Sequence, residues 1–182
     1  MLDRKESTLI DTRYSMPTLG ADKVTDITPE ILHKMGVSSI ILDVDNTLSA
    51  PGKQTPYPGT IEWVQKMLKN NFQIIILSNN FKRRVSPFAA KYYLDSLSLG
   101  CKPLPFSYFA AMRRLHSSRH NTVVIGDQVF TDIVGANLAG LRSILLTPQT
   151  PESKRSFVYR RSKENRVREY LRKNGLYISS KE

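Results

Sequence analysis

Short, unbroken runs of apolar residues alternate along this chain with segments in which apolar residues recur every three or four positions. Four runs have the length of a strand: "SSIILDV" (38–44), "FQIIILS" (72–78), "NTVVIGD" (121–127) and "RSILLTP" (142–148). Continuous apolar runs of this length are typical of strands that are buried on both faces of a parallel sheet.

The segments between these runs have helical patterns. In residues 61–70, Ile61, Val64 and Leu68 recur at helical spacing. Similar patterns cover residues 84–94, 107–118 and 130–140. Short buried strands that alternate with helices predict a doubly wound, Rossmann-like α/β fold with a parallel sheet of about five strands.

Two helix boundaries can be predicted from Pro and Gly. In residues 26–36, Thr28 is placed to cap a short helix, Pro29 to open it and Gly36 to end it. In residues 84–94, Pro87 predicts a helix that starts near Ser86, with the proline in its first turn.

The length of 182 residues and a hydrophobic content of 40% suit one domain with one core. We divide this single domain, 1–182, into an N-terminal extension with a short helix (1–36), a core (37–150) and a basic, helical C-terminal tail (151–182). No segment has the pattern of a signal peptide or a membrane span, and Cys101 is the single cysteine, so we expect a cytoplasmic protein. The net charge of +11 favours polyanionic partners.

Polar residues gather where the predicted strands end. In a doubly wound sheet, ligands bind beyond the carboxyl ends of the strands, near the switch in strand order. The residues found there are Asp43, Asp45, Thr47, Ser78, Asn79, Asn80 and Asp127. Lys102 precedes a predicted helix and could enter the same crevice. We therefore expect these side chains to converge.

Asp43 and Asp45 follow one buried strand with a single residue between them. Three interpretations compete: a solvated strand end, a cation site, or a nucleophile with an acid/base beside it. Clustered carboxylates without local arginines are most simply satisfied by a divalent cation with oxygen ligands. Mg²⁺ fits best, because it takes one or two carboxylates together with substrate phosphate and water.

At these positions the chain resembles the haloacid dehalogenase (HAD) superfamily of phosphohydrolases. "DVDNT" (43–47) matches its DxDxT motif, Ser78 the serine of its second motif and Lys102 the lysine of its third. "GDQVFTD" (126–132) matches the fourth motif, GDxxxxD. Four motifs in order, each at a strand end or a helix start, are far more specific than DxDxT alone.

The resemblance implies how the carboxylates would act. Asp43 would attack phosphorus and form an aspartyl-phosphate, while Asp45 would protonate the leaving oxygen and later activate water. Mg²⁺ would be held by the side chains of Asp43 and Asp127 and by the backbone carbonyl of Asp45.

The resemblance also implies supporting roles. Ser78, Asn79 and Lys102 would bind the phosphoryl oxygens of the substrate. Thr47 would orient a neighbouring site residue, and Asp132 would be a partner of Lys102 or of the metal.

Each of these residues also has a purely structural interpretation. Ser78 and Asn79 favour turns, and a lysine before a proline, such as Lys102, is commonly an exposed charge. Asp127 could cap the following helix, and Asp132 could be a carboxylate of its first turn. The convergence of four motifs at one crevice favours the site.

The spacing of the motifs bears on the substrate. Mobile cap domains of this superfamily are inserted after the first motif or between the second and the third. Here 35 positions separate Asp43 from Ser78, and 24 separate Ser78 from Lys102. That length suffices only for core helices, so we expect an uncapped crevice. An open crevice suits a large substrate, unless a partner subunit covers it.

More of the chain resembles the YqeG-type phosphatases of subfamily IIIA, which are related to the mitochondrial phosphatidylglycerophosphate phosphatases. The matching segments include "DITPEILHKMGVSSIILDVDNTL" (26–48), "VVIGDQVFTDIVGANLAG" (123–140) and "SKENRVREYL" (162–171). The resemblance implies a phosphomonoester hydrolase, with phosphatidylglycerophosphate as the best substrate. A soluble nucleotide or sugar phosphate, a phosphoprotein or a nucleic-acid end is the alternative.

The tail over residues 154–173 combines many Arg and Lys residues with a few apolar ones. A basic amphipathic helix can lie on an anionic membrane, which would place the protein at the inner face of the membrane. The same helix could instead dock on its own domain and expose a charged face. The charge would also suit nucleic acid or the ribosome, although no recognition motif supports this. Oligomerisation leaves no mark on the sequence.

Two other classes of protein remain open. A receiver-type signalling domain also pairs an aspartate with magnesium on a doubly wound sheet, but Asp45 favours completed hydrolysis over a long-lived phosphoenzyme. A ribosome-associated or nucleic-acid-binding module could carry a vestigial site. All four motif positions hold chemically competent residues, which disfavours decay.

Overall fold

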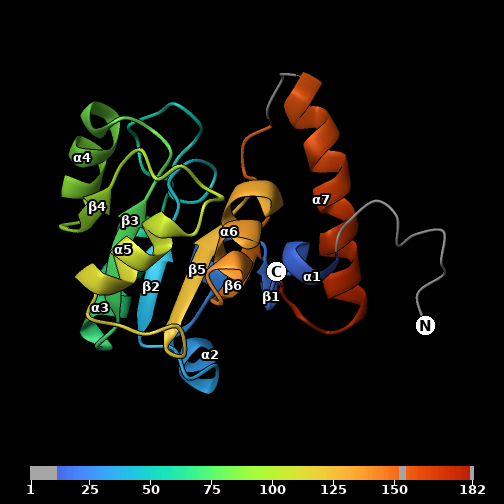
Figure 1. Cartoon of the computed structure of the whole chain (residues 1–182), viewed down its shortest axis with the longest axis horizontal. Coiled ribbons are helices and arrows are strands. Elements are labelled where there is room, and N and C mark those ends of the chain that lie inside the picture. Colours follow the sequence, from blue (N-terminus) through green and yellow to red (C-terminus); the bar gives the residue numbers. More distant parts are fainter. Residues whose placement is uncertain (1–11, 152–154, 181–182) are drawn as a thin grey trace.

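The structure is a computed structural model, and it describes residues 12–151 and 155–180 (Figure 1). The strands are β1 (Leu19–Ala21), β2 (Ser39–Leu42), β3 (Gln73–Leu77), β4 (Asp95–Leu97), β5 (Thr122–Gly126), β6 (Arg142–Leu146) and β7 (Tyr177–Ile178). The helices are α1 (Thr12–Ser15), η1 (Val24–Asp26), α2 (Pro29–Lys34), α3 (Thr60–Lys69), α4 (Lys82–Ala90), α5 (Phe106–Arg114), η2 (Val129–Ile133), α6 (Val134–Leu138) and α7 (Arg155–Lys173).

Within the described residues the strands form one seven-stranded sheet in the order β4-β3-β2-β5-β6-β1-β7, and all neighbouring strands are parallel. The predicted doubly wound α/β fold is confirmed. The predicted number of about five strands was too low. β1, β4 and β7 have only two or three residues each and lie at or near the two edges of the sheet, so they leave no apolar run in the sequence.

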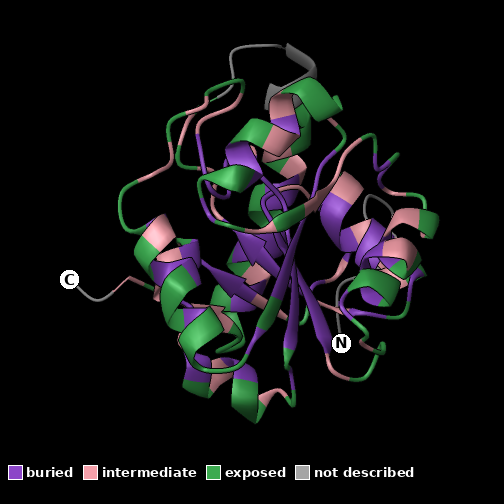
Figure 2. Ribbon diagram, turned by 90° about the vertical axis from the view of Figure 1, so that its left-hand side faces the viewer, coloured by how far each residue is buried: buried purple, intermediate pink, exposed green. Residues whose placement is uncertain are grey.

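The sheet is covered by helices on both faces, and the alternation of side chains along each strand explains why its central strands are mostly apolar. In β2, Ile40 and Leu42 belong to the hydrophobic cluster that includes residues of α3 and α4. Ile41, between them, belongs to the cluster with residues of α5 and α6. All four residues of β2 are buried (Figure 2). A strand packed on both faces buries nearly every side chain, so apolar residues predominate in it.

α2 follows the sequence prediction. The Thr28 hydroxyl accepts a hydrogen bond from the backbone N–H of Ile31 at 3.5 Å, and Pro29 is the first helical residue. The chain leaves the helix through Gly36, whose φ of +67° is favoured by glycine. This short helix leads directly into β2.

α4 does not begin near Ser86, as we predicted, but at Lys82, with Pro87 inside the helix. Its buried residues Val85, Phe88 and Ala89 lie at helical spacing and pack into the core. Burial of this face stabilises a longer helix than the proline alone would allow. The earlier start also brings Arg84 into the helix.

α7 docks on the domain. Val167 and Leu171 pack against Val129, Ile133 and Leu145, and β7 then pairs with β1 at the edge of the sheet. Figure 1 shows α7 alongside the β6–β1 side of the sheet. Of the two arrangements considered for the basic tail, the described residues therefore adopt the docked helix with an exposed charged face. In the described part of the chain, no helix combines the length and the apolarity that crossing a bilayer requires.

Candidate active site

The polar residues predicted to converge lie at the carboxyl edge of the three central strands. Asp43 follows β2, Ser78 follows β3 and Asp127 follows β5. β2 is flanked by β3 on one side and by β5 on the other. This is the position at which the strand order reverses, where a doubly wound sheet forms its ligand crevice.

A buried lysine joins two of the carboxylates. Lys102 Nζ lies 2.5 Å from Asp43 Oδ1 and 2.6 Å from Asp132 Oδ1, and it donates to the carbonyl oxygen of Leu77 at 3.2 Å. All three charged side chains are less than one-tenth exposed. Gly126 makes room for Asp132, because a Cβ on this glycine would lie 2.4 Å from Asp132 Cγ. Asp132, predicted as a partner of Lys102 or of the metal, contacts Lys102.

Burial sets the protonation of this cluster. Loss of solvation raises the pKa of Asp43 to about 7, although the nearby Lys102 ammonium lowers it and the Asp132 carboxylate adds to the rise. Burial alone would lower the pKa of Lys102, but Asp132 and Asp43 raise it above its ordinary value. Lys102 therefore stays charged and fixes the position of Asp43.

Asp127 completes a group of carboxylate oxygens. One oxygen each from Asp43, Asp127 and Asp132 lies within 4.8 Å of the others, and all three residues are buried. Asp127 Oδ1 is buried without a hydrogen-bond partner among the described residues, and burial raises the pKa of Asp127 well above its ordinary range. An unpartnered carboxylate oxygen beside two others fits a hard divalent cation such as Mg²⁺. The predicted ligands Asp43 and Asp127 thus meet, with Asp132 as a third carboxylate.

The Asp45 side chain turns away from this oxygen group. It forms an ion pair with Arg84, accepts a hydrogen bond from Asn80 Nδ2 at 2.8 Å, and accepts another from the backbone N–H of Gly52 at 3.1 Å. One-quarter of the side chain is exposed. Asp45 is therefore held at the entrance of the crevice, where it can contact both substrate and water.

Ser78 and Asn79 lie beside the cluster in different ways. Ser78 Oγ is buried and accepts hydrogen bonds from the backbone N–H of Asn80 at 3.2 Å and from its side-chain nitrogen at 3.3 Å. The Asn79 amide accepts from the backbone N–H of Lys102 at 2.7 Å and donates to the Lys102 carbonyl at 3.1 Å. Asn79, predicted to bind phosphate, here fixes the backbone that carries Lys102.

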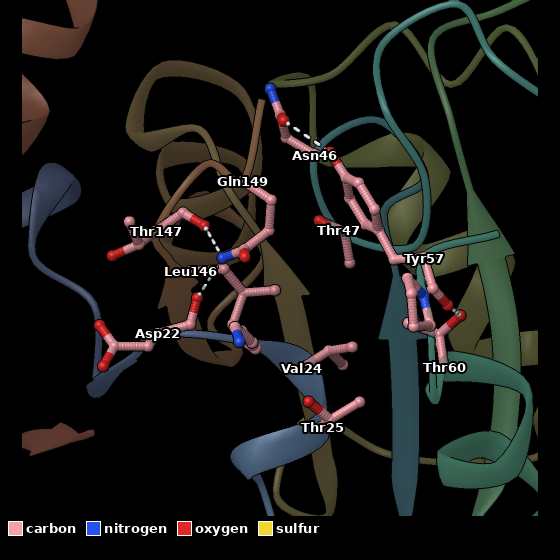
Figure 3. Close-up of a pocket in the computed structure, with 12 residues that line it drawn as sticks. Asp22, Val24, Thr25, Asn46, Thr47, Tyr57, Thr60, Leu146, Thr147 and Gln149 are labelled. Atoms are coloured by element: carbon pink, nitrogen blue, oxygen red, sulfur yellow. Dashed lines mark hydrogen bonds between the residues drawn. The ribbon is translucent and has the colours of Figure 1, made fainter. Parts of the chain in front are cut away.

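Thr47 lies on the far side of the loop after β2, where it lines a cavity of about 160 Å³ (Figure 3). Its hydroxyl is buried and has no hydrogen-bond partner within the described part of the chain. Asn46 lines the same cavity and accepts hydrogen bonds from Tyr57 and from the backbone N–H of Thr150. Within the described residues, the Thr47 hydroxyl therefore forms no hydrogen bond to Asp43 or Asp45, and Thr47 lines the cavity instead.

The C-terminal helix supplies a second charged group. Arg161 Nη2 lies 2.5 Å from Asp127 Oδ2, and Arg161 Nη1 lies 2.8 Å from Glu164 Oε2. Glu164 accepts the backbone N–H of Val129 at 2.9 Å, in the turn after Asp127. Arg168 donates to the backbone carbonyls of Asp127 at 2.9 Å and Leu146 at 2.8 Å. α7 thus holds the backbone and the side chain of an expected metal ligand.

Two arginines were not predicted from the sequence. We expected carboxylates without local arginines, whereas Arg84 and Arg161 reach Asp45 and Asp127 from segments distant in sequence. The tail did contain a signal: positions 161, 164, 167, 168 and 171 lie on one face of a helix, and this face mixes apolar with charged residues. A charged residue on a docking face indicates a buried partner.

Comparisons with known proteins agree with this geometry. A family model described as HAD-hydrolase-like matches residues 100–156, and one described as mitochondrial PGP phosphatase matches residues 4–85. Together the two matches include the four predicted motifs. The parallel sheet and the cluster at its carboxyl edge are those of a HAD-type phosphatase.

A curated relative, "Probable phosphatase YqeG" of Bacillus subtilis, is 31% identical over 163 residues, which cover 90% of this chain and 95% of the relative. The chain therefore belongs to the YqeG family of HAD phosphatases.

Solved structures resemble the fold at lower identity. A protein of Listeria monocytogenes serotype 4b has a TM-score of 0.52 and 22% identity, covering 65% of this chain and 84% of that one. The cobalt-bound deoxy-D-mannose-octulosonate 8-phosphate phosphatase of Haemophilus influenzae has a TM-score of 0.52 and 15% identity, covering 64% and 72%. At these identities, the two structures show a similar fold.

Proposed function

We propose that this phosphatase hydrolyses phosphomonoesters with Mg²⁺ through an aspartyl-phosphate on Asp43, and that phosphatidylglycerophosphate is its best substrate. The observation that carries the proposal is the Lys102–Asp43 contact of 2.5 Å at the edge of a buried group of carboxylate oxygens. A lysine placed there holds the nucleophile and leaves the ammonium close to the transferring phosphoryl group.

Two carboxylates divide the chemistry. An oxygen of Asp43 forms a bond to phosphorus while the bond to the leaving oxygen breaks, and Asp45, in its protonated form, gives its proton to that oxygen. Asp45 then takes a proton from water, whose oxygen attacks the phosphoryl group and releases phosphate and the Asp43 carboxylate. Arg84 and Asn80 hold Asp45 in place for both transfers.

Mg²⁺, held by Asp43 and Asp127 with the backbone carbonyl of Asp45, would neutralise charge that otherwise repels an anionic substrate. Asp132 is the third carboxylate of the oxygen group and the second partner of Lys102. Ser78 Oγ accepts from Asn80, so its own O–H is available to donate to a phosphoryl oxygen.

The choice of a lipid substrate is supported by two observations. The family model that matches residues 4–85 is described as a mitochondrial PGP phosphatase. Between Asp43 and Lys102 the fully described chain contains α3, β3, α4, β4 and loops, with no inserted domain over the crevice. An uncovered crevice admits a headgroup that remains in a membrane, and the enzyme would then work at the inner face of that membrane.

The experiment is phosphate release in the presence of Mg²⁺. Phosphatidylglycerophosphate in anionic vesicles is compared with an aryl phosphate and with a panel of soluble sugar and nucleotide phosphates. We expect strong preference for the lipid. Activity on soluble phosphates alone would support the proposed chemistry and exclude the lipid as substrate. No activity on any substrate, combined with salt-dependent binding of RNA, would favour a binding module with a vestigial site.

Replacement Asp43→Asn is the matched blank for this assay. The amide retains the shape of the carboxylate but is a poor nucleophile, so turnover should fall by roughly 10³-fold or more and no phosphoenzyme should form. Trapping of the phosphoenzyme by acid quench, with thermal melting to check the fold, measures both effects. An unchanged rate would exclude the mechanism.

A further inference from the structure

Large apolar side chains are exposed around the entrance of the crevice. Phe81 is 71% exposed, Leu99 54%, Leu104 52% and Phe106 73%. We call these four residues the apolar rim. Single exposed apolar residues are ordinary on protein surfaces, but a contiguous group of them usually marks an interaction site.

Phe81, Leu99 and Leu104 lie in loops and Phe106 opens α5, and these segments are joined to one another and to the site. Phe81 follows Asn80, whose backbone carbonyl accepts the N–H of Leu99 at 2.9 Å. Leu104 and Phe106 follow Lys102, whose backbone is held on both sides by Asn79. Leu99, Leu104 and Phe106 line an open hollow of about 440 Å³. The rim is therefore one surface, and it adjoins the lysine that contacts Asp43.

The charge of this edge is positive. Lys82 and Arg83 follow Phe81 directly and are exposed, and within the described residues no carboxylate forms an ion pair with either. The carboxylates of the crevice already contact other cations: Lys102 contacts Asp43 and Asp132, and Arg84 contacts Asp45. Apolar side chains beside uncompensated cations complement a surface that is apolar inside and anionic outside.

We propose that the apolar rim docks this phosphatase on an anionic lipid surface, with the rim side chains at the acyl boundary and with Lys82 and Arg83 against the headgroup phosphates. This inference rests on the proposed function in one respect: the docked crevice would face a lipid phosphate. It assigns membrane contact to the loops after β3 and β4, whereas the sequence suggested the tail. In α7, Glu164 and Arg168 are committed to the domain.

The test measures binding of the full chain to vesicles without turnover. Flotation with vesicles of phosphatidylcholine containing phosphatidylglycerol is compared with flotation on phosphatidylcholine alone. Leu104→Ser with Phe106→Ser should weaken binding to the anionic vesicles by roughly tenfold or more, because two large apolar side chains leave the interface. The matched control is Leu138→Ser, which removes an exposed leucine at the end of α6, and it should bind like the wild type.

The charges are tested separately. Lys82→Glu with Arg83→Glu should weaken binding by at least about fivefold. Lys34→Glu with Lys69→Glu makes the same change in net charge at exposed positions in α2 and α3, at the opposite edge of the sheet, and should have little effect. A larger loss of vesicle binding in the first pair than in the second indicates a local docking surface, and equal losses indicate general attraction of a basic protein to anionic lipid.

Unchanged aryl phosphatase activity and melting temperature in the rim variant would show that the fold and site are intact. Wild-type protein that does not float, or a rim variant that floats like the wild type, overturns the proposal. Loss of binding only on charge reversal of Lys163 and Arg166 would return the contact to α7 and also overturn it. Failure to hydrolyse phosphatidylglycerophosphate, with rim-dependent flotation retained, would count against the proposed substrate but not against docking.

Discussion

Two buried charged clusters lie on either side of Asp127, and they differ in how completely their charges are satisfied. In the crevice cluster, Asp43 and Asp132 share the ammonium of Lys102, and Asp127 lies beside them with its Oδ1 unpartnered among the described residues. In the α7 cluster, Glu164 and Arg168 contact backbone groups as well as charges. The crevice cluster contains a carboxylate oxygen without a hydrogen-bond partner, whereas Glu164 and Arg168 of the α7 cluster both have partners.

This difference indicates that the crevice cluster is suited to chemistry and that the α7 cluster has a structural role. Buried carboxylates in excess over cations weaken the fold unless a cation or a proton joins them, and sites that perform chemistry commonly retain such strain. A saturated cluster stabilises the arrangement of segments and has no unused group for a substrate. Arg161 connects the two, because it contacts both Asp127 and Glu164.

The largest effect on stability is expected from Lys102→Met. Asp43 and Asp132 would lose their shared cation, and the free energy of unfolding should fall by about 3–5 kcal/mol at pH 8. Because the Lys102 ammonium no longer lowers it, the pKa of Asp43 rises further in the folded state, so the folded protein binds more protons than the unfolded one and the loss should shrink as the pH falls to 6. Urea unfolding at both pH values, with the exposed Lys69→Met as control, measures this. A loss below about 1 kcal/mol at pH 8 would show that the burial of Asp43 and Asp132 does not depend on the charge of Lys102.

Arg168→Met should lower the free energy of unfolding by about 2–4 kcal/mol, because three hydrogen bonds to the carbonyls of Leu146 and Asp127 are lost. Well below the melting temperature, the aryl phosphatase rate should fall by less than about tenfold. Arg166→Met makes the same change at an exposed position of α7 and should leave both quantities unchanged. If the rate fell as far as in Asp43→Asn, the two clusters would be one functional unit.

Arg161→Met should change the response to Mg²⁺. The guanidinium places a positive charge beside an expected ligand of the ion, so its removal should lower the half-saturating Mg²⁺ concentration by roughly threefold to tenfold. Calorimetric titration with Mg²⁺ and the Mg²⁺ dependence of the rate measure this, with the exposed neighbour Arg160→Met as control. A higher Mg²⁺ requirement would instead mean that Arg161 orients Asp127 for the ion.

The smallest effect is expected at a charged group outside both clusters. Asp22 accepts hydrogen bonds from Ser180 N–H at 3.1 Å, Tyr177 O–H at 3.0 Å and Arg172 Nη2 at 3.1 Å. Burial is the largest single influence and raises its pKa, but the three bonds together lower the pKa below its ordinary value. Asp22→Asn should therefore cost less than about 1 kcal/mol at neutral pH, and the difference should vanish as the pH falls below about 4. Thermal melting across this range measures it, and a loss of several kcal/mol would make this surface group as important as a buried cluster.

The part of the fold that the sequence predicted is the part with strong periodic patterns. β2, β3, β5 and β6 are buried on both faces, so their apolar runs had no other explanation. β1, β4 and β7 are formed by "LGA", "DSL" and "YI", which acquire strand structure by pairing with a neighbour already in place. The start of α4 was placed too late because packing of Val85 outweighed the signal of Pro87.

In the candidate site, too, some residues could be predicted from the sequence and others could not. Asp43 and Asp127 were predicted because the carboxyl ends of parallel strands must meet, whatever the details of packing, and Lys102 because it precedes a helix beside the same crevice. Arg84 and Arg161 depend on the rotation of α4 and α7 about their axes, which the core packing determines. Sequence therefore predicted which residues gather, and the structure added which cations neutralise them.

The position of α7 and β7 in the chain has a consequence for synthesis. A nascent chain emerges from its N-terminus, so residues 1–150 leave the ribosome before Glu164 and Arg168 can donate or accept a bond. Until then the outer edge of β1 is unpaired and the loop after Asp127 lacks its support. We therefore expect the loop after Asp127 to gain this support only after α7 has been synthesised, and the edge of β1 to be open to pairing with other strands until then.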